Sequence, residues 1–268
     1  MRLFDSHVHL DSEQYDEDRA EVIARAQAAG VEGFVCVGAV DGFLSAGRAL
    51  KLAEQYACVW ASVGIHPNDA EEPFDIKRLR ELASHPRVVA VGETGFDFYW
   101  KRASRESQER WFRAQIELAL ELDLPVIIHS REAAADCYAV LCDYQSDSKL
   151  RGVFHCFSED AEFAHKLEEI RFIVSVTGNI TFKNAHALRD AVGEIPLTRI
   201  MLETDGPYMA PQAFRGKRCE SSHMLESAKL IAQLKSVSVA EVADITTNNA
   251  LKFYGVSSNS DTASGGEL

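Results

Sequence analysis

The chain has 268 residues, of which 46% are hydrophobic, and its formal net charge is −13 at pH 7. This length and composition suffice for one large domain with a sizeable core and are ordinary for an α/β barrel. The acidic charge excludes the broad basic face of a protein that coats duplex nucleic acid, but it leaves room for a polyanion held by bound cations and a few local basic residues.

The sequence shows few features that would direct the chain to a membrane or stabilise it by disulfide bonds. No stretch approaches the roughly 20 uninterrupted apolar residues that span a bilayer, and the first ten residues lack the hydrophobic core and cleavage site of a signal peptide. We therefore expect a soluble, cytoplasmic protein without a membrane partner, and we expect a monomer. The six cysteines show no C-x-x-C pairing, which argues against a disulfide framework and a cysteine zinc site.

Short apolar runs alternate with longer amphipathic segments, such as 16–30 and 103–123, which is the pattern of repeated βα units around a parallel sheet. The runs that read as strands are 3–10, 32–38, 58–67, 88–95, 125–130, 152–157, 172–178 and 199–205. Eight strands with intervening helices predict a single α/β domain over residues 1–256, a closed TIM-like (β/α)8 barrel. An open doubly wound sheet is the alternative, but no glycine-rich phosphate loop follows the first run.

The end of the chain has a different composition. Residues 257–268 are polar, rich in small residues and without periodicity, so we predict a disordered tail there. No linker that would split residues 1–256 into two domains is visible in the sequence.

Ligand-type residues follow several of the apolar runs. His7 and His9 stand one residue apart in the first run, and alternate residues of a strand share one face. Taken alone, such a pair is as consistent with ordinary buried or surface histidines as with metal ligands. Five further runs carry an ionisable residue at or near their C-terminal end, namely His66, Glu93, His129, His155 and Asp205.

Barrel enzymes place their chemistry at the C-terminal ends of the strands, so these residues are expected to converge there. So many ionisable groups are more than an apolar core absorbs unpaired, and we predict a metal site. The set contains His, Glu and Asp but no Cys, which favours Zn²⁺, Mn²⁺ or Mg²⁺. Six ligands exceed the needs of one hydrolytic ion with an open position, and two ions bridged by Glu93 would use all of them. The sequence leaves open whether one or two ions bind.

The chain carries a series of motifs in a fixed order: "FDSHVHLD", "GIHP", "GETGFDFY", "VIIHSREA", "GVFHCFS", "TGNITFKNA", "MLETDGPYMAP", "RGKRCE" and "ITTNNALKFYGV". Over residues 1–256 it resembles the TatD family of metal-dependent deoxyribonucleases in the amidohydrolase superfamily. The resemblance implies a TIM-like barrel and a 3′-to-5′ exonuclease acting on DNA ends or single strands. Some members are instead associated with removing D-amino acids from tRNA. The metal ligands that it implies are His7, His9, Glu93, His129, His155 and Asp205, with Glu93 as the bridge.

Phosphodiester hydrolysis requires a nucleophile at neutral pH and stabilisation of charge on the phosphoryl oxygens, and a divalent ion supplies both. We predict that Asp205, a ligand at the mouth of the barrel, is the catalytic base that takes the proton of the attacking water. Glu203 lies two residues earlier and is expected to point deeper into the barrel, where it would orient a ligating histidine.

Substrate contacts are predicted for His66, Arg131, Lys217 and Arg218, with Arg215 in the same loop as the last two. A basic cluster is most often a solvated loop, but beside a metal site on an acidic protein it favours a phosphate contact. The aromatic residues at 96 and 98–100 are as consistent with packing on the barrel rim as with stacking on nucleobases.

Two other functions remain open. A D-aminoacyl-tRNA deacylase or another amidohydrolase would use the same ligands, because a metal-activated hydroxide attacks carbon as readily as phosphorus. The basic loop "FRGKRCE" favours a phosphate substrate. A non-catalytic metal-binding protein is the second alternative, but it would have lost a ligand or the base, and none is missing here.

Overall fold

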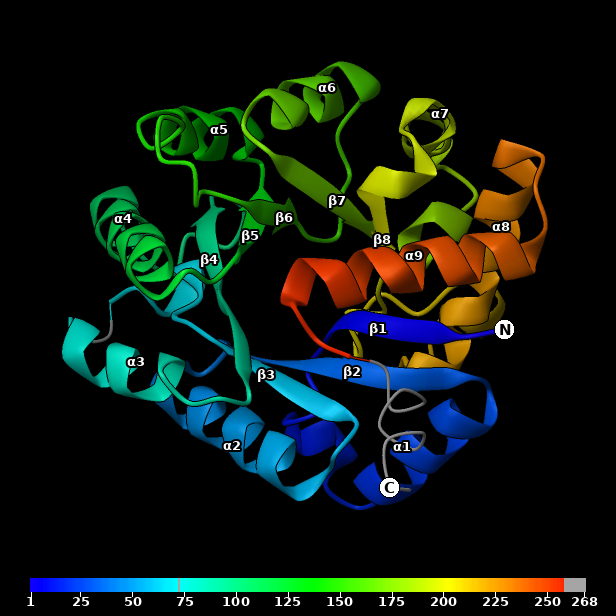
Figure 1. The fold of residues 1–268 in the computed structure, drawn as a ribbon, viewed down its shortest axis with the longest axis horizontal. Helices are drawn as coiled ribbons and strands as arrows, with labels where there is room; N and C mark the ends of the chain where they lie inside the picture. Colours follow the sequence, from blue (N-terminus) through cyan, green and yellow to red (C-terminus); the bar gives the residue numbers. More distant parts are fainter. Residues whose placement is uncertain (72, 258–268) are drawn as a thin grey trace, which may run out of the picture.

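The computed structural model describes residues 1–71 and 73–257, and within them eight parallel strands form one sheet in the order β1 to β8 (Figure 1). The strands are β1 (Leu3–Val8), β2 (Val31–Gly38), β3 (Val59–Val63), β4 (Val88–Asp97), β5 (Val126–Arg131), β6 (Gly152–Phe154), β7 (Phe172–Val176) and β8 (Ile200–Leu202). The predicted TIM-like (β/α)8 barrel is confirmed. Apart from Ser257, the tail predicted over 257–268 lies outside the described residues.

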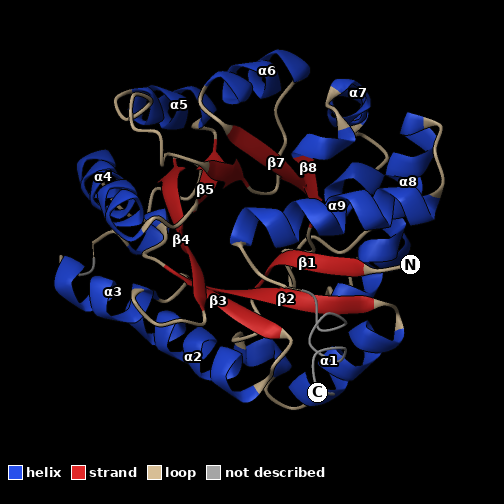
Figure 2. Cartoon of the chain, in the orientation of Figure 1, coloured by secondary structure: helices blue, strands red, loops and turns tan. Residues whose placement is uncertain are grey.

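Helices surround the sheet, as Figure 2 shows. They are α1 (Arg19–Ala28), α2 (Gly42–Gln55), α3 (Ile76–Ala83), α4 (Arg105–Leu122), α5 (Ala134–Cys142), α6 (Ala161–Glu169), α7 (His186–Glu194), α8 (Met224–Lys235) and α9 (Val239–Tyr254). Local sequence sets several ends: the Ser104 and Ser238 hydroxyls accept a backbone N–H at the start of α4 and α9, and α9 ends at Gly255, whose φ is 65°. Among the described residues, no helix combines the length and apolar character needed to cross a membrane.

The barrel closes between β8 and β1 through contacts made largely beyond the end of β8. The backbone N–H of Asp205 donates to the carbonyl of His7 at 2.9 Å, and the N–H of His9 donates to the carbonyl of Gly206 at 2.8 Å. The Asp5 carboxylate accepts the backbone N–H and the hydroxyl of Thr204 at 3.0 and 2.6 Å. These bonds hold the residues after β8 against the end of β1.

The core has two parts, one between the sheet and the surrounding helices and one inside the barrel. The interior cluster includes Phe4, Val37 and Trp60, and it is covered by Tyr254 of α9. In Figure 1, α9 crosses the barrel, and its Thr247 hydroxyl donates to the carbonyl of residue 2, just before β1. Helix α9 therefore covers the end at which the strands begin, leaving the opposite end for the candidate site.

A β-bulge in β4 places Glu93 inside the barrel mouth. The pairing of β4 with β5 shifts between Gly92 and Thr94, so Glu93 is the extra residue. Gly92 and Gly95 flank it with φ values of 139° and 136°, and a Cβ at these two positions would lie 2.6 and 2.1 Å from backbone oxygens of β5. Glycine is therefore required on both sides of Glu93 for the two strands to approach.

Candidate metal centre

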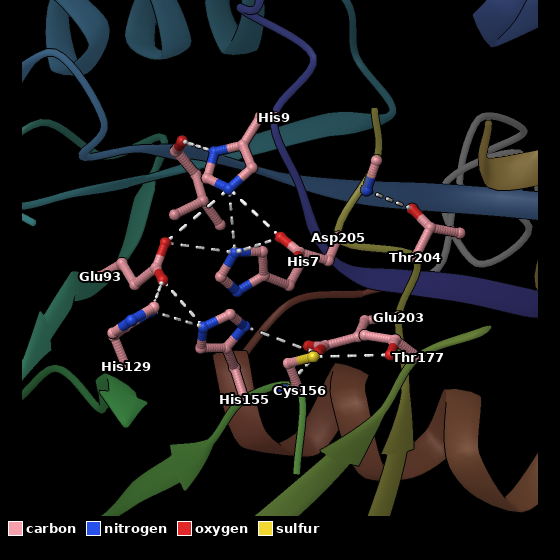
Figure 3. Close-up of polar contacts among 12 residues, drawn as sticks. His7, His9, Glu93, His129, His155, Cys156, Thr177, Glu203, Thr204 and Asp205 are labelled. Carbon is pink, nitrogen blue, oxygen red and sulfur yellow. Dashed lines mark hydrogen bonds and ion pairs between the residues drawn. The ribbon is translucent and has the colours of Figure 1, made fainter. Parts of the chain in front are cut away.

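The six predicted ligands meet at the C-terminal ends of the strands (Figure 3). His7 lies in β1 and His9 directly follows that strand. Glu93 and His129 lie in β4 and β5, His155 directly follows β6, and Asp205 lies three residues beyond the end of β8. Figure 3 shows the carboxylate of Glu93 between two groups of imidazoles. The full set is His7, His9, Glu93, His129, His155 and Asp205.

The first group of ligand atoms surrounds Oε2 of Glu93. Nε2 of His7 lies 3.5 Å from this oxygen and Nε2 of His9 lies 3.8 Å from it. Oδ1 of Asp205 lies 3.7 and 3.4 Å from the same two nitrogens. The two nitrogens are 3.4 Å apart, so four ligand atoms face one small space.

The second group surrounds the other oxygen of the same carboxylate. Nδ1 of His129 and Nε2 of His155 lie 2.6 and 2.8 Å from Oε1 of Glu93 and 3.3 Å from each other. One carboxylate thus offers one oxygen to each group, so Glu93 would be shared by two cations if each group held one.

The donor set fits divalent cations. Oε2 of Glu93 is buried and has no hydrogen-bond partner among the described residues, although an unpaired buried carboxylate oxygen is costly. Burial alone would raise the pKa of Glu93, but the neighbouring histidines, led by His155 and His66, outweigh it and hold that pKa well below its usual value. An ionised carboxylate surrounded by imidazole nitrogens, without thiolates, suits Zn²⁺, Mn²⁺ or Mg²⁺.

Hydrogen bonds fix which nitrogen of two imidazoles is free to bind a cation. Nδ1 of His9 lies 2.9 Å from the carbonyl oxygen of Val37, which only accepts, so Nδ1 carries the proton and Nε2 is left with its lone pair. Nε2 of His129 lies 3.2 Å from Oδ2 of Asp97, an ionised acceptor, so its Nδ1 is the free nitrogen. In both rings the free nitrogen is the one that faces Glu93.

His66 differs from these ligands. Its Nε2 lies close to the second group, 3.6 Å from Oε1 of Glu93 and 3.3 Å from Nδ1 of His129. However, its Nδ1 accepts the backbone N–H of Asn68 at 3.0 Å, so in the neutral ring Nε2 carries the proton. Burial lowers the pKa of His66 to about 3, which keeps the ring neutral. The geometry therefore makes His66 a hydrogen-bond donor at the cluster, in keeping with its predicted role as a substrate contact.

Glu203 lies on the side of His155 that faces away from Glu93, as Figure 3 shows. Its Oε1 is 3.6 Å from Nδ1 of His155 and accepts the backbone N–H of Cys156 at 2.6 Å, while its Oε2 accepts the hydroxyl of Ser175 at 2.6 Å. With both oxygens engaged deep in the barrel, Glu203 is placed to orient His155, whereas Asp205 faces the cavity.

Asp97 was missed from the sequence as a functional residue. Besides Nε2 of His129, it accepts the side-chain amide of Asn68 at 3.1 Å and the backbone N–H groups of Tyr99 and Trp100 at 3.0 Å each. Burial alone would raise the pKa of Asp97, but these donors lower it to about 2. Its signal was the second acid of "GETGFDFY", four residues after Glu93 on the same strand.

We expect Asp97→Asn to lower metal occupancy and hydrolysis by roughly 10- to 100-fold, the usual effect of removing a group that orients a metal-binding histidine. The neutral amide would balance the charge of a metal-bound imidazole less well and could present its NH₂ to His129. Elemental analysis and turnover at saturating metal test this. Asp123→Asn makes the same change on an exposed acid paired with Arg151 and should have no effect. Full occupancy with a normal rate for Asp97→Asn would contradict the orienting role.

The cluster of predicted ligands opens into a cavity of about 450 Å³. Arg131, one of the predicted substrate contacts, lines this cavity together with His66 and the unpredicted Arg102. An adjoining hollow of about 240 Å³ shares Arg131 and Asp205 with the first. Two cations and one neutral N–H donor thus face the space beside the cluster.

The other two predicted phosphate contacts lie elsewhere. Arg218 donates to both oxygens of Asp18 at 2.7 Å and to Glu220 at 2.9 Å, and its guanidinium lies 4.8 Å from the ring centre of Tyr15. Arg218 therefore joins its own loop to the residue that precedes α1, with both of its terminal NH₂ groups engaged. Lys217 is exposed and belongs to the lining of neither cavity. The structure does not bring these two side chains to the cluster, because the loop folds toward α1.

The four aromatic residues that follow Glu93 differ in burial. Phe96 belongs to β4 and is fully buried, with its ring 5.5 Å from that of Phe112. Phe98 packs on Phe96 at 5.4 Å. Only Tyr99 and Trp100 are exposed, at 49% and 52%. Phe96 is therefore part of the core, Phe98 is partly buried against it, and the last two rings lie on the surface.

Known proteins resemble this chain over nearly its whole length. The family model described as TatD related DNase matches residues 4–255. The metal-dependent hydrolase YabD of Bacillus subtilis is 41% identical over 254 residues, which cover 94% of this chain and 98% of that protein. The Salmonella typhimurium protein named 3′-5′ ssDNA/RNA exonuclease TatD is 32% identical over 261 residues, covering 95% and 99%.

The fold is shared with a solved structure as well. YjjV, a TatD homologue from Escherichia coli, superimposes with a TM-score of 0.88 at 29% identity, covering 96% of this chain and 99% of that one. The match of the family model confirms the resemblance read from the motifs. The chain belongs to the family of TatD-related DNases, and it is a metal-dependent hydrolase of the TatD type.

Proposed function

We propose that this hydrolase is a deoxyribonuclease that removes nucleotides from the 3′ ends of DNA, preferring free ends or single strands. The observation that carries the proposal is the carboxylate of Glu93 shared between two ligand groups, beside a cavity lined by Arg131 and Arg102. A pair of cations next to guanidinium groups suits a phosphodiester, whose negative charge they would bind. The name of the Salmonella relative supports the same activity.

When bound, one or two divalent cations would supply an acidified water and polarise the phosphoryl group. The chain's own residues supply the rest. The Arg131 guanidinium would hold phosphoryl oxygens at the cavity wall, and Nε2–H of His66 would donate to one of them. The Asp205 carboxylate lines both cavities and would take the proton of the attacking water. Burial alone would raise the pKa of Asp205, but the neighbouring imidazoles, led by that of His9, lower it, so the base is ionised.

Binding at an end also agrees with the surface charge. The net charge of −13 opposes a long contact with duplex DNA, whereas an end needs cations only around one or two phosphates. Arg131 and Arg102 are placed for such a local contact.

The test is an assay of the metal-stripped protein with Mg²⁺, Mn²⁺ or Zn²⁺ added back separately. We expect 5′-labelled single-stranded and 3′-tailed DNA to shorten stepwise from the 3′ end with at least one of these ions. RNA and D-aminoacyl-tRNA are included as competing substrates. Faster release of D-amino acids than of nucleotides would replace the proposal by a deacylase. Metal uptake without hydrolysis of any substrate would instead indicate a non-catalytic metal-binding protein.

A further inference from the structure

Exposed apolar side chains gather at the mouth of the cavity that holds the metal cluster. Val40, Trp100 and Tyr208 line this cavity and are 38%, 52% and 48% exposed. Tyr99 lies beside Trp100, with ring centres 5.0 Å apart. Exposed apolar groups that are contiguous and rimmed by polar side chains are typical of a binding surface. The metal cluster by itself does not account for these rings.

The two exposed rings lie on opposite sides of the barrel mouth. Trp100 follows β4 and Tyr208 follows β8, and strands four positions apart in an eight-stranded barrel face each other. The Tyr208 ring is in edge contact with His9 of the cluster, at 6.0 Å between ring centres. A ligand that reaches the cluster therefore enters between the two aromatic side chains.

Two guanidinium groups lie against the rings of Tyr99 and Trp100, which follow β4. The guanidinium carbon of Arg131 is 4.1 Å from the ring centre of Tyr99 and 5.5 Å from that of Trp100. That of Arg102 is 5.6 Å from Trp100. Such contacts restrict the rings and keep positive charge beside them. This rim therefore offers a flat apolar surface next to phosphate-binding groups.

The position of Trp100 is also tied to the metal cluster. The carboxylate that orients His129, that of Asp97, accepts the backbone N–H groups of Tyr99 and Trp100. The turn that carries the two rings is thus held by the same group as a metal-binding histidine. The position of Trp100 at the cavity mouth is therefore fixed by the same residue that arranges a candidate metal ligand.

We propose that Trp100 and Tyr208 stack on unpaired bases of a DNA end, while Arg131 and Arg102 hold the adjoining phosphates. This inference rests on the proposed nuclease function and adds a physical reason for a preference for single-stranded or frayed ends. An interior base of a duplex is covered by its neighbours on both faces, and a terminal base is still paired and covered on one face. A single-stranded or frayed end therefore offers its bases to aromatic rings more readily. Stacking accepts every base, which suits an exonuclease that must advance through any sequence.

Two single strands that differ only in their bases provide the first test. One ends in thymidines, and the other carries base-free tetrahydrofuran residues at the same 3′ positions. We expect the metal-loaded full-length protein to cleave the thymidine end more efficiently, by roughly 5- to 100-fold in kcat/KM. Trp100→Ala and Tyr208→Ala should slow cleavage of the thymidine strand more than that of the base-free strand and so reduce this preference, and Trp100→Phe should retain most of it. Leu44→Ala, at an exposed apolar residue of α2, should change neither rate.

Intrinsic fluorescence gives a second test that does not depend on hydrolysis. The chain has three tryptophans, and Trp60 and Trp111 are buried whereas Trp100 is half exposed. Thymidine 5′-monophosphate, but not deoxyribose 5-phosphate, should therefore quench the metal-loaded protein, and Trp100→Phe should abolish the quenching.

The outcomes separate the two proposals. Equal cleavage of both strands, with Trp100→Ala slowing both alike, would overturn the stacking inference while leaving the nuclease function in place. Failure to cleave either strand with metal bound would overturn the nuclease function and this inference with it.

Discussion

Glu93→Gln is expected to abolish hydrolysis, with a loss of at least about a thousandfold, and to lower metal content at the same time. The size follows from its position: removing a group that only orients a ligand costs roughly 10- to 100-fold, and Glu93 contacts both ligand groups directly. The amide keeps the shape of the carboxylate but loses the charge that would hold two cations close together. Elemental analysis and turnover on single-stranded DNA, measured on one preparation, check this.

The same experiment needs a control for the loss of one charge. Glu121→Gln removes an acid that is exposed and paired with Arg80, and it should leave metal content and turnover unchanged. Circular dichroism of the Glu93→Gln protein should match that of the unaltered chain, since the barrel core does not include this side chain. Unchanged metal content in a folded Glu93→Gln protein would show that Glu93 is not the bridge.

Asp205→Asn is expected to reduce turnover by at least about a hundredfold, because general-base catalysis typically contributes that much. Its amide cannot take a proton from water, whereas the other five ligand side chains stay in place. Binding of a DNA end, followed by fluorescence anisotropy at saturating metal, should therefore largely survive.

Glu203→Gln is the matched comparison, two residues away in the same segment. It should cost less, roughly 10- to 100-fold, because Glu203 contacts His155 from behind and does not line the cavity. The ratio of the two losses is the informative quantity. An inactive Glu203→Gln protein beside a substantially active Asp205→Asn protein would reverse the two roles.

The barrel and the place where the candidate cluster forms can both be predicted from the order of residues along the chain. An apolar run followed by a polar ligand-type residue is visible without a structure, as for "PVIIH" and His129. Parallel strands joined by helices all end on the same side, so residues that end different runs must meet at one rim. Placing His129 and His155 together needed only this rule, and their nitrogens lie 3.3 Å apart.

The finer assignments could not be predicted in this way, because they depend on contacts between segments that are distant in the sequence. The bulge in β4 sets which oxygen of Glu93 faces which group of histidines. The backbone N–H of Asn68 occupies Nδ1 of His66, and this contact makes Nε2 of His66 a hydrogen-bond donor. Arg218 was expected beside a phosphate, but it pairs with Asp18, 200 positions earlier in the chain, because the path of its loop toward α1 cannot be read from local sequence.

The aromatic residues after Glu93 show the same division. Their sequence shows four rings after Glu93 and leaves packing on the barrel rim and stacking on bases equally open, and nothing in it distinguishes Phe96 from Trp100. The strand continues to Asp97, so Phe96 points into the helix layer against Phe112, whereas Trp100 lies beyond the turn and stays exposed. Burial is decided by what packs against a residue from elsewhere in the chain, which is why the fold, and not the motif, separates a core ring from one that is free to bind.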